Sequence, residues 1–222
     1  LSAYNAKAFG VRDYIAQMMF NSPPGTSDAM DIAKMAASLE MTADLEDSSF
    51  RIWKQTRTGL LSYPLEENAA RAHLAASIYA QMGLKPHIVH IVGHTEAHHA
   101  ASAKDVIDAA KMARRVIENA LAGQADMLSD PAVIERRKEL IKETKVLLQA
   151  IKNIHQGREG DAFIDPQTLA DSVAKGILDA PHLKNNPFAC GEIRTRIIHG
   201  ACEVVDQHQR KLTESQRLAE FL

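Results

Sequence analysis

The residues best suited to chemistry lie together in 87–99, which read His-Ile-Val-His-Ile-Val-Gly-His-Thr-Glu-Ala-His-His. This stretch holds five of the chain's ten histidines and one carboxylate, Glu96. Imidazole changes charge near neutral pH, and a carboxylate accepts hydrogen bonds from hydroxyl groups. An apolar strand that runs into a polar loop and then a helix is where parallel α/β folds place functional side chains. Glu96 and His94 are therefore the first candidate site residues.

The histidines in this stretch also suggest a metal site. His90, His94 and His98 are four residues apart, and on one helix they would face the same side, as zinc ligands do. His90, however, belongs to the predicted strand, so the spacing loses this meaning. We predict no metal site, and a metal-dependent barrel hydrolase or lyase that uses these histidines stays as an alternative.

The elements that must position these residues are three strand–helix units. Strands are predicted at 14–20, 50–56 and 86–92, and helices at 29–41, 66–82 and 104–121. The strands begin near residues 13, 50 and 86, which are 37 and 36 residues apart, and such regular alternation indicates parallel βα architecture. No GxGxxG or Walker A motif follows a strand. We therefore expect an α/β fold containing part of a (β/α)8 TIM-type barrel.

Polar residues at the end of the second strand add to the candidate site. Gln55 and Arg57 stand where barrel enzymes carry catalytic side chains. Arg57 is the best carboxylate ligand of the segment, because a guanidinium group binds both oxygens of a carboxylate. Trp53 and Tyr63 could pack against a flat cofactor, and we assign them to the core instead.

The second half of the chain reads as an α-helical extension, so we place one domain at 1–125 and the other at 126–222. Asp130-Pro131 and Asp165-Pro166 each begin a helix, and a further helix is predicted at 192–210. Three strands do not close a barrel, and Phe163-Ile164 is the only further strand candidate. The remaining strands are expected from another chain or from residues outside this segment.

Composition narrows the class of protein. The chain has 222 residues, 45% of them hydrophobic, with a net charge of −2 and a pI of about 6.6. The sequence has no basic stripe that would indicate a nucleic-acid partner, and no apolar run long enough to indicate a membrane span. Two cysteines, Cys190 and Cys202, form no disulfide framework or metal motif, which favours a reduced, cytoplasmic protein. The first residue is Leu, so we expect a segment that is processed, trimmed or part of a longer chain.

Several phrases of the sequence resemble a known family. They are Lys54 to Gly59, the Ala-rich helix Ala69 to Ala80, Ile88 to Ala97, and Lys111-Met112-Ala113, with weaker likeness in Val173 to Pro181 and Pro187 to Cys190. In order and spacing they resemble the C-terminal portion of the large, barrel-forming subunit of coenzyme-B12-dependent glutamate mutase (methylaspartate mutase). No single motif is diagnostic.

The resemblance implies a barrel whose mouth faces adenosylcobalamin, with Glu96 holding the ribose hydroxyls of the adenosyl group. The family's lysine is not matched, since Gly93 or His94 stands at its place in a loop one residue shorter. The cobalt-binding phrase Asp-x-His-x-x-Gly is not matched by Asp206 to Lys211, which reads as helix. A separate cobalamin-binding subunit or domain is thus implied as a partner.

These observations lead to three functional hypotheses. The first is a component of an adenosylcobalamin-dependent mutase that rearranges a small carboxylic or amino acid by radical chemistry. Its catalytic candidates are Glu96, His94 and Arg57, and its cofactor-binding candidates are Glu96, His94, Gly93 and Gln55. The second is the metal-dependent hydrolase or lyase, and the third is a non-catalytic subunit that completes a barrel.

Overall fold

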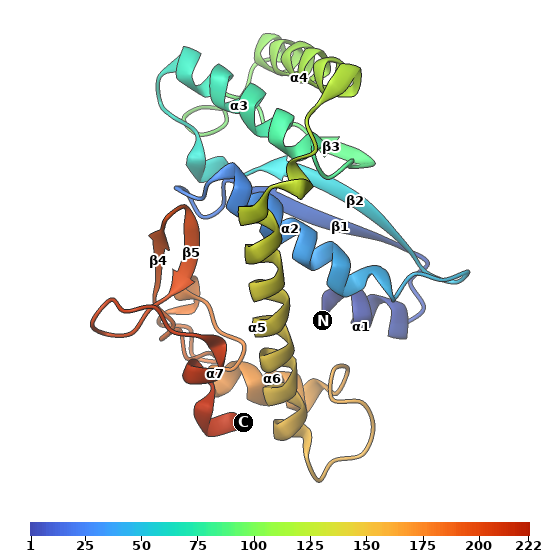
Figure 1. Ribbon diagram of the computed structural model, residues 1–222, viewed down its shortest axis with the longest axis vertical. Helices are drawn as coiled ribbons and strands as arrows, with labels where there is room; N and C mark the ends of the chain where they lie inside the picture. Colours follow the sequence, from blue (N-terminus) through green and yellow to red (C-terminus); the bar gives the residue numbers. More distant parts are fainter. The chain divides into compact units, whose positions relative to one another are not determined.

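The computed structural model describes residues 1–222, which form two compact units (Figure 1). One unit comprises Arg12–Arg137, and the other comprises Leu1–Val11 with Lys138–Leu222. The division between them falls within the helix α5 (Pro131–His155), whereas the sequence placed it at residues 125 and 126. The protein is of the mixed α/β class.

The unit Arg12–Arg137 alternates strands and helices, as the sequence predicted. Its elements are β1 (Asp13–Phe20), α2 (Asp28–Ala43), β2 (Arg51–Thr58), the 3-10 turn η1 (Leu60–Ser62), α3 (Glu67–Met82), β3 (Ile88–His90), α4 (Ala103–Gly123), the 3-10 turn η2 (Met127–Ser129) and the first residues of α5. β3 has three residues, fewer than the predicted 86–92.

The three strands form one parallel sheet in the order β1-β2-β3, and the sheet is open, not a closed barrel. β1 and β2 pair along their whole length, from Asp13 opposite Arg51 to Phe20 opposite Thr58. β3 pairs only with the end of β2, where His90 lies opposite Arg57. Because all strands point the same way, their carboxyl ends meet at one edge.

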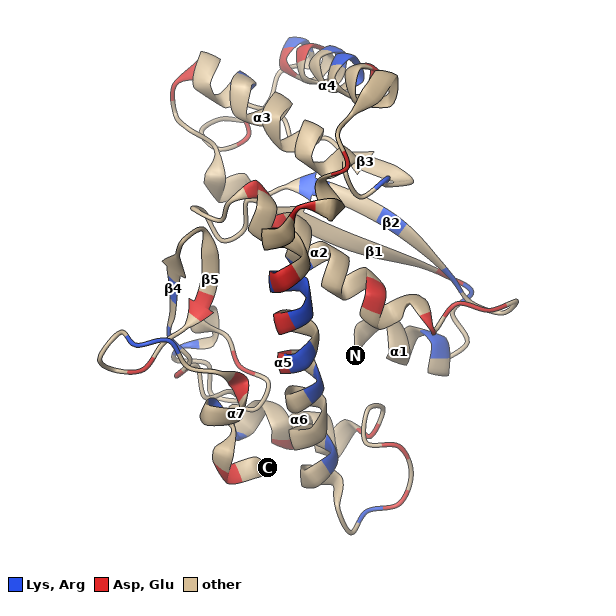
Figure 2. Cartoon of the chain, viewed as in Figure 1, with Lys and Arg blue, Asp and Glu red and all other residues tan.

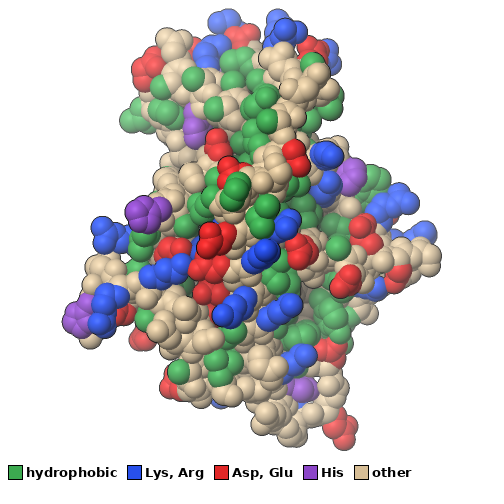
Figure 3. All heavy atoms as spheres, in the orientation of Figure 1, with side chains coloured by type: hydrophobic (Ala, Val, Ile, Leu, Met, Phe, Trp, Pro, Cys, Tyr) green, Lys and Arg blue, Asp and Glu red, His purple; other side chains and the backbone are tan.

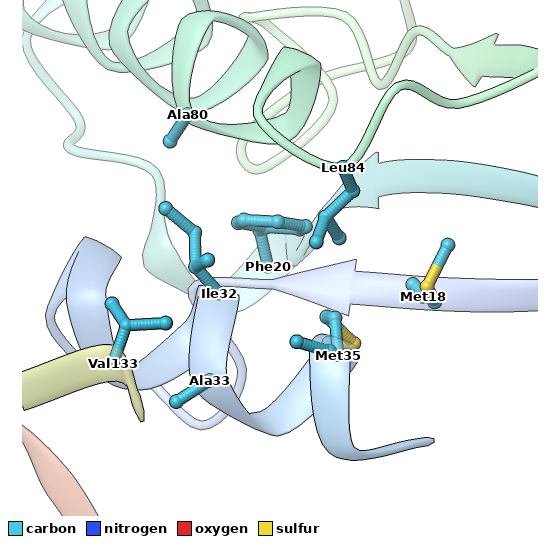
Figure 4. Packing of buried hydrophobic residues seen from close by; sticks show 9 residues of the cluster. Met18, Phe20, Ile32, Ala33, Met35, Ala80, Leu84 and Val133 are labelled. Atoms are coloured by element: carbon cyan, nitrogen blue, oxygen red, sulfur yellow. The ribbon is translucent and has the colours of Figure 1, made fainter. Parts of the chain in front are cut away.

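One face of this sheet is covered by helices (Figure 4). Met18 and Phe20 of β1 pack against Ile32 and Met35 of α2, and Ala80 of α3 closes the same cluster. A second cluster joins α3 to α4, and hydrophobic side chains follow the seam between these helices in Figure 3. Successive strand residues point to opposite faces, so every second residue of β1 and β2 faces away from α2 and α3.

The helix starts are fixed by side chains that the sequence displays. The Ser27 hydroxyl accepts the backbone N–H of Met30 at the start of α2, and Ser102 forms a capping box with Asp105 at the start of α4. Asp130 accepts the backbone N–H of Ala132 ahead of α5. These caps supply partners for N–H groups that a helix leaves unbonded, which is why the predicted helices begin within a few residues of the observed ones.

The other unit contains most of α5 and several short elements. They are α1 (Ser2–Ala8), α6 (Pro166–Ala174), the 3-10 turn η3 (Pro181–Leu183), β4 (Thr195–Ile198), β5 (Ala201–Val204), α7 (Glu214–Arg217) and the 3-10 turn η4 (Ala219–Phe221). Asp165 caps α6 and Pro166 occupies its first turn, as predicted. Ala150 and Ile151 of α5 pack with Ile177 and Leu218 to form the core.

The helix predicted at 192–210 is wrong, because these residues form the antiparallel hairpin β4–β5. His199 and Gly200 connect the strands with φ of 49° and 79°, the positive values that a tight two-residue hairpin turn requires. Burial then alternates, with Ala201 and Glu203 inside. Phe163-Ile164 is not a strand either, since it lies in a turn where Asp165 N–H bonds to the Asp161 carbonyl oxygen.

Candidate active site

The carboxyl edge of the parallel sheet brings Arg57 to the face that α2 and α3 leave uncovered. Arg57 lies opposite Met19 of β1 and His90 of β3, so these three side chains share that face. The neighbouring Thr58 points the other way and donates a hydrogen bond to Ser77 of α3 at 2.9 Å. The Nε atom of Arg57 is buried without a hydrogen-bond partner. Such a group favours an acceptor on a ligand.

Gln55 lies on the same face, one side-chain row nearer the start of β2. It pairs with Gln17 of β1 and Ile88 of β3. The row before it is apolar at Ile15, which is 50% exposed. The uncovered face therefore changes from apolar to polar toward the carboxyl edge, and Arg57 is the outermost cation on β2.

Glu96 lies in a turn directly after β3. Its backbone N–H bonds to the carbonyl oxygen of Gly93 at 3.1 Å, and its Oε1 accepts the N–H of Gly93 at 2.5 Å. Glu96 is exposed, and its Oε2 has no hydrogen bond. A Cβ at Gly93 would lie 3.1 Å from that Oε1, so glycine gives the carboxylate room to fold back. One oxygen holds the turn, and the other is free to accept a hydroxyl group.

Tyr63, which the sequence assigned to the core, links these two candidates. Its ring is buried, and its hydroxyl donates to the carbonyl oxygen of Val92 at 2.8 Å, one residue before Gly93. Burial is the main cause that raises the pKa of Tyr63 to about 12; the charge of Glu96 contributes to the rise, and Thr58 and the charge of Arg57 oppose it. Both candidate charges therefore act on one phenol, and no local motif signalled this role.

His94 faces a different environment. Its ring is fully buried, and neither nitrogen has a hydrogen-bond partner. Burial lowers the pKa of His94 first and the charge of Arg71 second, while Asp105, Glu67 and Asp108 oppose them. These charges belong to α3 and α4, not to Arg57 or Glu96. The structure thus places Arg57 at the end of β2 and Glu96 in the turn after β3, while the charges that act on His94 come from α3 and α4.

The three histidines of the suggested zinc arrangement do not converge. His90 is exposed on the sheet face, His94 is buried, and His98 is exposed with its ring 4.5 Å from that of His99. No group of three or more His, Cys, Asp or Glu side chains in the chain is arranged to hold a metal ion. The strand and the turn separate residues that a helix would have aligned.

Asp206 and His208 lie in a turn after β5 rather than in the predicted helix. The Asp206 carboxylate accepts the backbone N–H groups of His208 and Arg210, at 2.8 and 2.9 Å, and also bonds the Arg210 side chain. Its role is to close the turn.

Comparisons with known proteins add no family. No protein-family model and no curated protein matches the chain. No helix is long and apolar enough to cross a membrane. The site is therefore interpreted from its own geometry.

Proposed function

We propose that this chain is a barrel-forming component of an adenosylcobalamin-dependent carbon-skeleton mutase acting on a small carboxylic or amino acid. The observation that carries the proposal is the placement of Arg57 at the carboxyl end of β2 and of Glu96 in the turn after the adjacent parallel strand β3. Side chains at this edge are the ones that parallel α/β enzymes use. The sequence resemblance supplies the reaction class.

The open sheet supports a barrel completed by further strands. β1 and β3 each pair on one side only, and the face that α2 and α3 leave uncovered exposes Ile15 and Ile88. Unpaired edges and exposed apolar faces favour association with more strands. We propose that another chain or residues beyond this segment supply them, giving a TIM-type (β/α)8 barrel.

The residues present fit the adenosyl end of the cofactor. The free Oε2 of Glu96 can accept a ribose hydroxyl, and Gly93 gives the carboxylate room to fold back over the turn. The family's cobalt-binding phrase is not matched in this sequence, so we propose that a cobalamin-binding subunit or domain supplies the histidine that ligates cobalt. When bound, the cofactor supplies the radical chemistry. His94 contacts the ligand only if its buried ring leaves the helices.

The chain's own residues bind and orient in this proposal. Arg57 would bind the substrate carboxylate through two parallel hydrogen bonds. Gln55, on the same face, would donate its amide N–H to a substrate or cofactor oxygen. Glu96 would fix the adenosyl ribose. Together they would hold the reacting groups still and exclude water around a reactive intermediate.

The first test is whether a corrinoid accompanies the chain. The affinity-tagged full chain, purified natively from its host cells, should show a corrinoid absorption spectrum. Glu96→Gln should weaken the retention of adenosylcobalamin about 10- to 100-fold, because a neutral amide replaces a charged acceptor. Glu118→Gln, an exposed change on α4, is the matched control. The proposal fails if no corrinoid is found and Glu96→Gln behaves as the control does.

The second candidate function is a non-catalytic subunit that completes a barrel. The exposed apolar residues of the sheet favour it, as does the missing family lysine. A purified complex that keeps full turnover with Glu96→Gln, and with Arg57→Lys, would support this function over the first.

A further inference from the structure

We propose that Tyr63 is a positioning residue that fixes the Glu96 turn relative to the end of β2, and so sets the placement of the Glu96 carboxylate with respect to Arg57. This inference rests on the proposed function for its purpose, because it concerns the same site. Packing in the core does not by itself require the Tyr63 hydroxyl group.

The first step is the position of Tyr63 and the contact that its hydroxyl group makes. It follows η1 directly, and η1 begins two residues after the end of β2. Its hydroxyl donates to the Val92 carbonyl oxygen at 2.8 Å. Val92 is itself buried, as is Gly93. Tyr63 therefore bridges the end of one strand to the entry of the next strand's loop.

The second step concerns the hydrogen bonds between the Glu96 turn and the sheet, since Val92, Ile91 and Ala97 otherwise hold the loop by apolar packing. β3 ends at His90, so residues 91–96 have no ladder bonds to β2. Within the turn, Glu96 bonds only to Gly93, through its N–H and its Oε1. The turn is internally closed, and the Tyr63 hydroxyl is a polar contact that ties its entry to β2. Losing that bond should let the turn move relative to β2 and should weaken the bond between the Gly93 N–H and the Glu96 carboxylate.

The ring of Tyr63 is held in place independently of the hydroxyl. It packs with Leu74 and Ala70 of α3, and it meets the His73 ring edge to face at 5.1 Å. His73 in turn contacts the Ser62 hydroxyl at 2.7 Å. Tyr63→Phe therefore removes the bond to Val92 and keeps the packing.

The test is nuclear magnetic resonance of the full chain without cofactor. In Tyr63→Phe, hydrogen exchange at the Gly93 and Glu96 amides should rise about 5- to 10-fold, the change expected for one lost hydrogen bond. The Gly93 amide proton shift, which reports its bond to the carboxylate, should move toward the value in Glu96→Gln. Amides of β1 should keep their rates. Tyr79→Phe, which lies on α3 with a partly exposed ring, is the control and should change none of these.

Unchanged Gly93 exchange in Tyr63→Phe would overturn the inference, as would an equal acceleration at every amide, which indicates general destabilisation. If Tyr63→Phe does not fold, 3-fluorotyrosine at position 63 replaces it. Its more acidic hydroxyl donates a stronger bond and should slow Gly93 exchange, and no slowing relative to 3-fluorotyrosine at position 79 would also overturn the inference. These measurements are made without cobalamin. Failure of the mutase proposal can therefore be distinguished from failure of this inference.

Discussion

At the scale of single residues, His94 is the most unusual side chain of the candidate site. A fully buried imidazole with two unbonded nitrogens is disfavoured, since buried polar groups normally have hydrogen-bond partners. The ring lies where charges of Glu67 and Arg71 on α3 and of Asp105 and Asp108 on α4 act on it. The loop between Gly93 and Glu96 therefore contains a ring whose charged form is disfavoured by burial.

This arrangement predicts acid sensitivity. The pKa of His94 lies below its usual value of 6.5 in the folded chain, mainly through burial, so the unfolded chain takes up the proton first as pH falls. Stability should be complete above about pH 6.5 and should decrease as pH falls through the lowered pKa. Denaturant unfolding at several pH values measures this loss.

His94→Leu removes the unbonded nitrogens and the titration. Below about pH 6 the variant should be more stable than the natural chain, by about 1–2 kcal/mol, and its stability should depend less on pH. His98→Leu changes an exposed ring and should follow the natural chain. Parallel losses in the natural chain and in His94→Leu would show that the buried ring does not cause the acid sensitivity.

At the scale of elements, Asp31 of α2 holds the residue after β1 in place by hydrogen bonds. Its fully buried carboxylate accepts the Asn21 backbone N–H at 2.5 Å, the Thr26 hydroxyl at 3.0 Å and the Lys34 ammonium at 2.7 Å. Asn21 has a φ of 54°, a left-handed conformation that needs such support. Its side-chain oxygen accepts the Ser77 hydroxyl of α3 at 2.7 Å, so two helices hold the strand end.

Removing this carboxylate should destabilise the sheet unit strongly. Asp31→Ala leaves a buried N–H group without an acceptor and a cation without its partner, a cost of about 2–4 kcal/mol. Asp44→Ala, which removes an exposed carboxylate at the other end of α2, should change stability by less than about 0.5 kcal/mol. Urea unfolding followed by Trp53 fluorescence gives both values, and equal effects would refute the role of Asp31.

The comparison of sequence with structure follows from which interactions are local. The apolar runs 14–20 and 50–56 and the helix starts at Asp130-Pro131 and Asp165-Pro166 are local signals, and they located strands and helices between residues 13 and 174. The β4–β5 hairpin was missed because its turn residues, His199 and Gly200, are a weaker signal than the usual Asn-Gly pair. Charged residues around it read as a helix surface.

The candidate site was predicted in part for the same reason. The carboxyl ends of parallel strands lie at the same edge of a sheet. The alternation of strands and helices therefore predicted that Arg57 and the loop after β3 lie at one edge. The direction of the His94 ring and the bond from Tyr63 to Val92 depend on the path of the loop and on α3 and α4. Those are long-range contacts, and no spacing in the sequence encodes them.

At the scale of the whole molecule, the chain contains separate hydrophobic cores. Two clusters, around Phe20 and around Leu74, belong to the unit Arg12–Arg137, and the cluster around Ile151 belongs to the other. The exposed side of α5 carries interspersed acidic and basic side chains, seen in Figures 2 and 3. Such surface charges contribute little to stability, so each unit depends mainly on its own core.

Separate cores predict separate unfolding transitions, which one glycine can distinguish. Gly191 has a φ of 62°, and a Cβ there would lie 2.4 Å from the backbone nitrogen of Lys184. Gly191→Ala should therefore destabilise the unit formed by Leu1–Val11 and Lys138–Leu222 by about 2–4 kcal/mol. Gly157 also has a positive φ, of 84°, but nothing lies within 4 Å of its Cβ position, so Gly157→Ala carries only the backbone cost.

The only tryptophan, Trp53, lies on β2 and reports on the sheet unit alone. In Gly191→Ala, part of the helical circular dichroism should be lost at a lower urea concentration, while the Trp53 transition keeps its midpoint. Gly157→Ala should shift the dichroism less and the fluorescence not at all. A single transition in which both signals move together would mean that the two units unfold as one, because a strain confined to residues 184–191 would then have weakened the sheet as well.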